Sequence, residues 1–139
     1  CGSLGISAAY LSNSLVLQRV TVEMGFWNDN YQPSAHQAAA MKLDLARLVE
    51  DNPACANCHF AYGHWFAWQA YVAAMPQARQ LFAEQAVASY QAGLRLQPVY
   101  RRAWSHLPKV AAGLPESEHA KLATMSRTQL NRIDRTLVQ

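Results

Sequence analysis

The chain has 139 residues, of which 51% are hydrophobic and only 15% are charged. Soluble proteins carry about 25% charged residues, so this composition excludes a disordered chain and indicates apolar surface that a partner, a membrane or a cofactor covers. The net charge is +3, and eight of the twelve basic residues lie within residues 95–139. These basic residues are spaced singly, without interleaved aromatic side chains, which argues against nucleic-acid binding.

The N-terminal segment, residues 1–30, is predicted to be a helix and a loop that can anchor the chain to a membrane. Cys1, followed by Gly2 and Ser3, resembles the start of a mature bacterial lipoprotein, whose first cysteine carries the lipid. The alternative is a cut made just inside a transmembrane helix, because residues 2–18 carry no charge. Their serines leave too few apolar residues to cross a bilayer. Both interpretations predict export to the periplasm, the outer membrane or the cell surface of a bacterium.

Hydrophobic periodicity, interrupted by proline and glycine, predicts about six helices. The first helix runs from about Leu4 to Gly25. The second begins after Ser34, because Ser34 and Gln37 form a capping-box pattern in which each side chain bonds a backbone N–H of the first turn. This second helix is expected to end near Asp51.

Prolines mark the starts of the remaining helices. Asn52 is expected to cap a third helix with Pro53 at its first position, where the missing N–H costs nothing. Pro76 opens a fourth helix, Pro98 precedes a fifth, and Pro115 precedes a sixth. Most of the aromatic side chains fall in the third helix: Phe60, Tyr62, Trp65, Phe66, Trp68 and Tyr71.

Helices of comparable length with short connections predict an all-α fold of antiparallel hairpins, in a domain that spans residues 31–139. The hairpins repeat at an offset of 45 residues. The aligned pairs are Pro53 with Pro98, His59 with Trp104, and Tyr62 with Leu107.

At these residues the chain resembles the tetratricopeptide family. The end of a repeat's second helix is matched by Ala86, Tyr90, Leu94, Leu96 and Pro98. Tyr62 and Gly63 stand where the family has a Leu-Gly pair. The resemblance covers Ala38 to Leu107, although the offset of 45 residues is longer than the usual repeat of about 34. It implies a tetratricopeptide-like stack of hairpins and a habit of binding other proteins, but no reaction.

The most specific short motif is CANCH, formed by residues 55–59. Two cysteines three residues apart and followed by histidine resemble the haem-attachment motif of c-type cytochromes. Two thiols on one helical turn can reach the two vinyl groups at one edge of a haem, and the adjacent imidazole can bind the iron. The motif therefore predicts one covalent haem c attached to Cys55 and Cys58, with His59 as an iron ligand.

A sixth iron ligand has to come from a different helix. The candidates are His36, Met41, Met75 and His106. We predict His106, because it lies two residues past Trp104 in the helix that the repeat relates to the motif.

Three other interpretations of Cys55 and Cys58 stay open. They can be small buried side chains beside a packed imidazole, a local disulfide of an oxidising compartment, or part of a metal site. Zinc would need two further ligands, and His64 lies about 140° around the helix from His59. If Cys1 carries a lipid and the other two cysteines carry haem, an exported chain has no odd thiol, which favours haem.

No catalytic machinery is predicted, because the sequence has no nucleophile elbow and no phosphate-binding glycine loop. We therefore expect a non-enzymatic, exported haem protein that transfers electrons or serves as a haem-bearing subunit. Its expected partners are a redox protein, neighbouring subunits or further copies of itself. The alternative is a haem-free tetratricopeptide-like scaffold that binds other proteins in an envelope or polysaccharide system.

Overall fold

The computed structural model describes residues 2–138, and their side chains over residues 13–136. The described residues form six α-helices and one short 3-10 helix, which confirms the predicted all-α fold. The chain divides into two compact units, Cys1–Pro53 and Ala54–Gln139. Each unit is described separately below.

The first unit contains α1 (Gly2–Gly25) and α2 (Ala35–Asp51), which contact each other. An ion pair joins them, since Arg19 Nη2 lies 2.7 Å from Asp44 Oδ2. The predicted capping box at the start of α2 is confirmed. Ser34 Oγ accepts a hydrogen bond from the Gln37 N–H at 3.1 Å, and Gln37 Oε1 accepts one from the Ser34 N–H at 2.9 Å.

Within the described residues, no helix has both the length and the apolar character needed to cross a membrane. The sequence suggested a division after residue 30, based on a possible anchor in residues 1–30, and that anchor remains a prediction. The compact units instead divide after Pro53, because α2 groups with α1.

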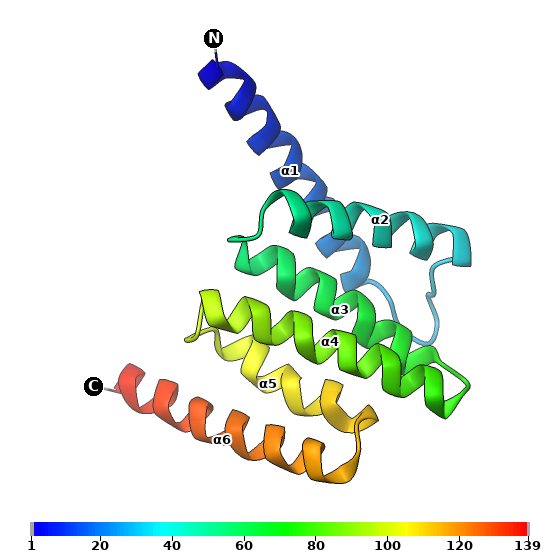
Figure 1. The fold of residues 1–139 in the computed structure, drawn as a ribbon, viewed down its shortest axis with the longest axis vertical. Helices are drawn as coiled ribbons and strands as arrows, with labels where there is room; N and C mark the ends of the chain where they lie inside the picture. Colours follow the sequence, from blue (N-terminus) through cyan, green and yellow to red (C-terminus); the bar gives the residue numbers. More distant parts are fainter. Residues whose placement is uncertain (1, 139) are drawn as a thin grey trace. The chain divides into compact units, whose positions relative to one another are not determined.

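The second unit contains four α-helices in succession, visible in green to red in Figure 1. They are α3 (Ala56–Val72), α4 (Pro76–Leu96), α5 (Arg101–Val110) and α6 (Glu116–Val138), with the 3-10 helix Ala111–Gly113 between the last two. Each helix contacts the next, and α3 also contacts α5. The predicted starts of the fourth and sixth helices and the aromatic character of the third are confirmed.

The α3 start differs from the sequence prediction. Asn52 does not open α3 but closes α2, because its backbone N–H and its side-chain amide both donate to the Leu48 carbonyl, at 2.9 and 3.0 Å. The chain then turns at Pro53, and α3 begins at Ala56 with Cys55 as its N-cap. The Leu48 carbonyl, at the C-terminal end of α2, therefore accepts hydrogen bonds from Asn52, the residue that was expected to cap α3.

The α3–α4 hairpin is closely packed at two glycines. A Cβ atom at Gly63 would lie 2.9 Å from the Tyr90 ring and 3.3 Å from the Ala86 carbonyl oxygen. A Cβ atom at Gly93 would overlap the Phe60 ring. The two helices approach this closely because neither glycine has a side chain.

The core of the second unit is shared by α3, α4, α5 and α6. Trp104 anchors α5 in this core, because its indole N–H donates to the Pro98 carbonyl at 2.7 Å. The buried members of the core are Phe60, Val87, Tyr90, Leu94, Ala103, Trp104, Leu107, Ala111 and Leu122.

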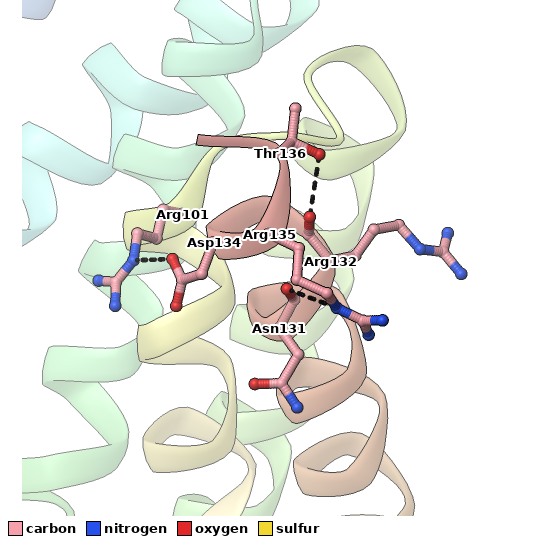
Figure 2. Close-up of polar contacts among 6 residues, drawn as sticks. All are labelled: Arg101, Asn131, Arg132, Asp134, Arg135 and Thr136. Atoms are coloured by element: carbon pink, nitrogen blue, oxygen red, sulfur yellow. Dashed lines mark hydrogen bonds and ion pairs between the residues drawn. The ribbon is translucent and has the colours of Figure 1, made fainter. Parts of the chain in front are cut away.

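The second hairpin, α5 with α6, is joined at its surface by an ion pair. Figure 2 shows Arg101 of α5 facing Asp134 of α6, with Nε 3.0 Å from Oδ1. Two local bonds to main-chain carbonyls also appear in the figure, from Arg135 to Asn131 and from Thr136 to Arg132.

Candidate functional site

The two cysteines of the CANCH motif lie in the first turn of α3 and are joined by a disulfide. Their Cα atoms are 5.3 Å apart, within the ordinary range for disulfides. Cys55 is the N-cap, and its Sγ accepts a hydrogen bond from the backbone N–H of Cys58 at 3.1 Å. Of the alternatives left open by the sequence, the structure contains the local disulfide.

This state of the motif does not fit a covalent haem. Thioether bonds form between free thiols and the vinyl groups of haem, whereas here the two sulfurs are bonded to each other. In addition, Cys58 is buried, with only 3% of the residue exposed. His59, the predicted iron ligand, is half-buried in the same turn.

The predicted sixth ligand, His106, lies in α5, where its charge acts on His64 of α3. His64 and His59 are five residues apart, so their side chains leave the helix about 140° apart. His106 therefore acts electrostatically on His64, which leaves α3 about 140° around the helix from His59. Among the described residues, no group of three or more histidine, cysteine or acidic side chains is placed to hold a metal ion.

His64 and His106 belong to a polar cluster on the second unit. We name it the α3–α5 cluster: His64 from α3, Tyr90 from α4, and Arg102 and His106 from α5. The spacing of residues along α3 explains why His64 faces α5. His64 lies one turn beyond Phe60, whose ring stacks on Tyr100 at 4.9 Å, and so continues the side of α3 that faces the start of α5.

Burial and positive charge control the protonation of the two imidazoles. The pKa of His64 is lowered by burial first, and then by the charges of His106 and Arg102. The pKa of His106 is lowered by burial first, and then by Arg102 and Lys109. Both imidazoles are therefore neutral around pH 7, since each pKa lies below the ordinary value of 6.5.

Tyr90 supplies a neutral hydroxyl to the α3–α5 cluster. Burial raises the pKa of Tyr90 to about 12, and Arg102 opposes part of that rise. The phenol therefore keeps its proton at physiological pH. Arg102 itself is exposed, so its guanidinium is free to meet a ligand from solvent.

This arrangement of hydrogen-bonding groups and positive charge suits recognition of an anion. Arg102 can bind a carboxylate through two parallel N–H donors, and the neutral imidazoles can donate or accept further hydrogen bonds. An incoming anion would also offset the positive charges that now lower both histidine pKa values.

Sequence reasoning missed the α3–α5 cluster as a unit. It considered His64 only as a zinc ligand and His106 only as an iron ligand. The available signals were the four-residue spacings from Phe60 to His64 and from Arg102 to His106, each of which places two side chains on one helix face. The proposed lipid site at Cys1 lies outside the described residues.

No protein-family model matches this chain, and no curated protein or solved structure shows significant similarity to it.

Proposed function

We propose that the second unit is a scaffold that binds a partner protein through the side of α3 and α5 that carries the α3–α5 cluster. The observation that carries this proposal is the convergence of His64, Arg102 and His106 from two helices that are not consecutive in the chain. Such a convergence depends on tertiary packing, and it concentrates hydrogen-bonding groups and positive charge at one place.

The succession of helices supports the proposal. In stacked helical repeats, the corresponding helices of neighbouring hairpins lie side by side and form an extended binding surface. Here α3 and α5 are the first helices of consecutive hairpins, and they contact each other. The resemblance to tetratricopeptide repeats in Ala38 to Leu107 agrees with this arrangement and with a protein-binding role.

The chemistry of the cluster indicates an acidic partner segment. Arg102 and Lys109 are exposed cations, and an anion would offset the positive charges that, after burial, lower the pKa values of His64 and His106. Aspartate and glutamate side chains, or a C-terminal carboxylate, supply the charge and planar geometry that an arginine guanidinium binds best.

Binding of a poly-glutamate peptide, followed by fluorescence anisotropy, tests the proposal. Arg102→Glu should weaken binding about 10-fold or more, because a charge-assisted hydrogen bond contributes about 1.5–3 kcal/mol. The matched control is Arg132→Glu, which makes the same charge change on the exposed surface of α6 and should alter affinity less than about 2-fold. Equal losses in the two variants would show that only net charge matters and would overturn the proposal.

Covalent haem attachment, which the CANCH motif predicts, is the competing proposal. It requires the Cys55–Cys58 disulfide to be reduced and Cys58 to become accessible. The mass of the intact chain separates the two proposals. Apart from any lipid at Cys1, a chain of unmodified mass, less two hydrogens for the disulfide, agrees with the scaffold, whereas a gain of one haem supports the cytochrome function.

Attachment through a lipid remains a proposal that depends on Cys1, whereas export is proposed from either interpretation of residues 1–30. Metabolic labelling with a lipid precursor in cells that make the full-length protein should label the natural chain. A Cys1→Ser variant should carry no label. Equal labelling of both chains would exclude Cys1 as the lipid site.

A further inference from the structure

We infer that Cys55 and Cys58 form a redox-active disulfide that accepts two electrons from a dithiol protein. This activity is independent of the scaffold function proposed above. Three features of the described residues carry it: the disulfide itself, its place in the first turn of α3, and the unequal exposure of its two cysteine residues.

The place of the disulfide stabilises the product of reduction. Cys55 occupies the N-cap of a 17-residue helix, and its Sγ already accepts the backbone N–H of Cys58. On reduction, the same N–H would donate to a thiolate, and the positive end of the helix would stabilise the negative sulfur. The first turn of α3 contains no acidic side chain that would repel this charge.

The exposures of the two cysteine residues indicate which sulfur is attacked. Cys55 is half-buried at the helix start, whereas Cys58 is 3% exposed. An incoming thiolate has to reach the sulfur it attacks, so it bonds Cys55 and releases Cys58. Cys58 is then held one turn away, where its re-attack on Cys55 reverses the step.

The exchange balances with a dithiol as the reductant. One thiolate of the partner bonds Cys55 Sγ, the Cys55–Cys58 bond breaks, and Cys58 leaves as a thiolate that takes a proton from water. The partner's second thiolate then attacks its own sulfur in the mixed disulfide and releases Cys55. Cys55 leaves as a thiolate, so the chain gains two electrons and one proton, and the partner's two thiolates become a disulfide.

A trapping experiment on the folded full-length chain tests this inference. Cys1→Ser removes the third thiol, and the probe is a thioredoxin-type protein whose resolving cysteine has been replaced by serine. We expect a mixed disulfide under native conditions, and mass spectrometry of its peptides should place the bond at Cys55. A trapped bond at Cys58 would overturn the order of attack that the exposures indicate.

Reaction rates of the single thiols provide the second measurement. With Ellman's reagent and in the Cys1→Ser background, the Cys58→Ser chain, which retains only Cys55, should react about 10-fold faster than the Cys55→Ser chain, because access and thiolate character favour Cys55. Circular dichroism checks that both variants are folded. If the natural disulfide resists dithiothreitol until urea unfolds the chain, the bond is structural and the inference is wrong.

Discussion

The two glycines of the α3–α4 hairpin show how single atoms determine the helix spacing. At Gly93 the space that a methyl group would need is filled by the Phe60 ring, which also stacks on Tyr100. At Gly63 the corresponding space is filled by the Tyr90 ring. Because Tyr90 also belongs to the α3–α5 cluster, its packing against Gly63 helps to hold that cluster in place.

Gly93→Ala should lower the free energy of unfolding by about 1–3 kcal/mol, because the added methyl group overpacks the core at Phe60. The loss should occur although alanine is the better helix former by about 1 kcal/mol. Urea titration measures it. In a Phe60→Leu background, which removes the ring, the same substitution should cost less, and an undiminished loss would show that the ring is not the cause.

The lowered histidine pKa values predict an acid-sensitive stability. The unfolded chain keeps the ordinary value of 6.5, so it binds more protons than the folded chain as the pH falls below that value. The stability is full above pH 6.5 and decreases toward the lower pKa values of the folded histidines. Burial is the main cause of this loss, followed by the neighbouring charges, Arg102 for both histidines and Lys109 for His106.

Urea midpoints at about pH 7.5 and pH 5.5 measure the effect. The double variant His64→Gln and His106→Gln should lose much of the difference between the two midpoints. An identical difference in the double variant and the natural chain would contradict the assignment.

The cysteine motif could be identified from the sequence, whereas the α3–α5 cluster could not. Cys55, Cys58 and His59 are adjacent in sequence, so a motif search finds them together. His64 and Arg102 come from α3 and α5, and only the packing of these helices brings them together. The disulfide, as opposed to haem, also could not be derived from the motif, because the same spacing serves both.

At the scale of the helix, local signals were sufficient where they acted alone. Ser34 with Gln37 and the proline at position 76 fixed the starts of α2 and α4, because a cap or a missing N–H acts within one turn. At Asn52 two helices competed for one polar side chain. Asn52 caps the end of α2, and a search for helix-start signals alone does not predict this role.

The ion pair between α5 and α6 gives a prediction at this scale. Arg101 and Asp134 are 58% and 49% exposed, so the pair should contribute no more than about 1 kcal/mol. A double-mutant cycle with Arg101→Ala and Asp134→Ala measures the coupling, which high salt should reduce. A coupling well above that value would mean that the pair holds the hairpin together.

For the whole molecule, the division after Pro53 separates two sets of contacts. The second unit holds its own core, drawn from α3 to α6 and centred on residues such as Trp104 and Leu107. The sequence predicted antiparallel hairpins from helix lengths and short loops. It did not predict this division, because α2 continues the helical pattern without a long linker before α3.

Residues 54–139, produced alone, should therefore fold cooperatively. Near-ultraviolet circular dichroism should report fixed aromatic packing, and thermal unfolding should be a single transition. A fragment with helical far-ultraviolet spectra but no near-ultraviolet signal would contradict this, because it would lack specific packing without the first unit.

The most direct test of the account is to map where an acidic peptide binds. Amide chemical shifts of the full-length chain, recorded during a titration with poly-glutamate, distinguish the α3–α5 cluster from the basic surface of α6. The account predicts that the largest changes lie around His64, Arg102 and His106. Changes confined to α6, around Arg127 and Arg132, would contradict it.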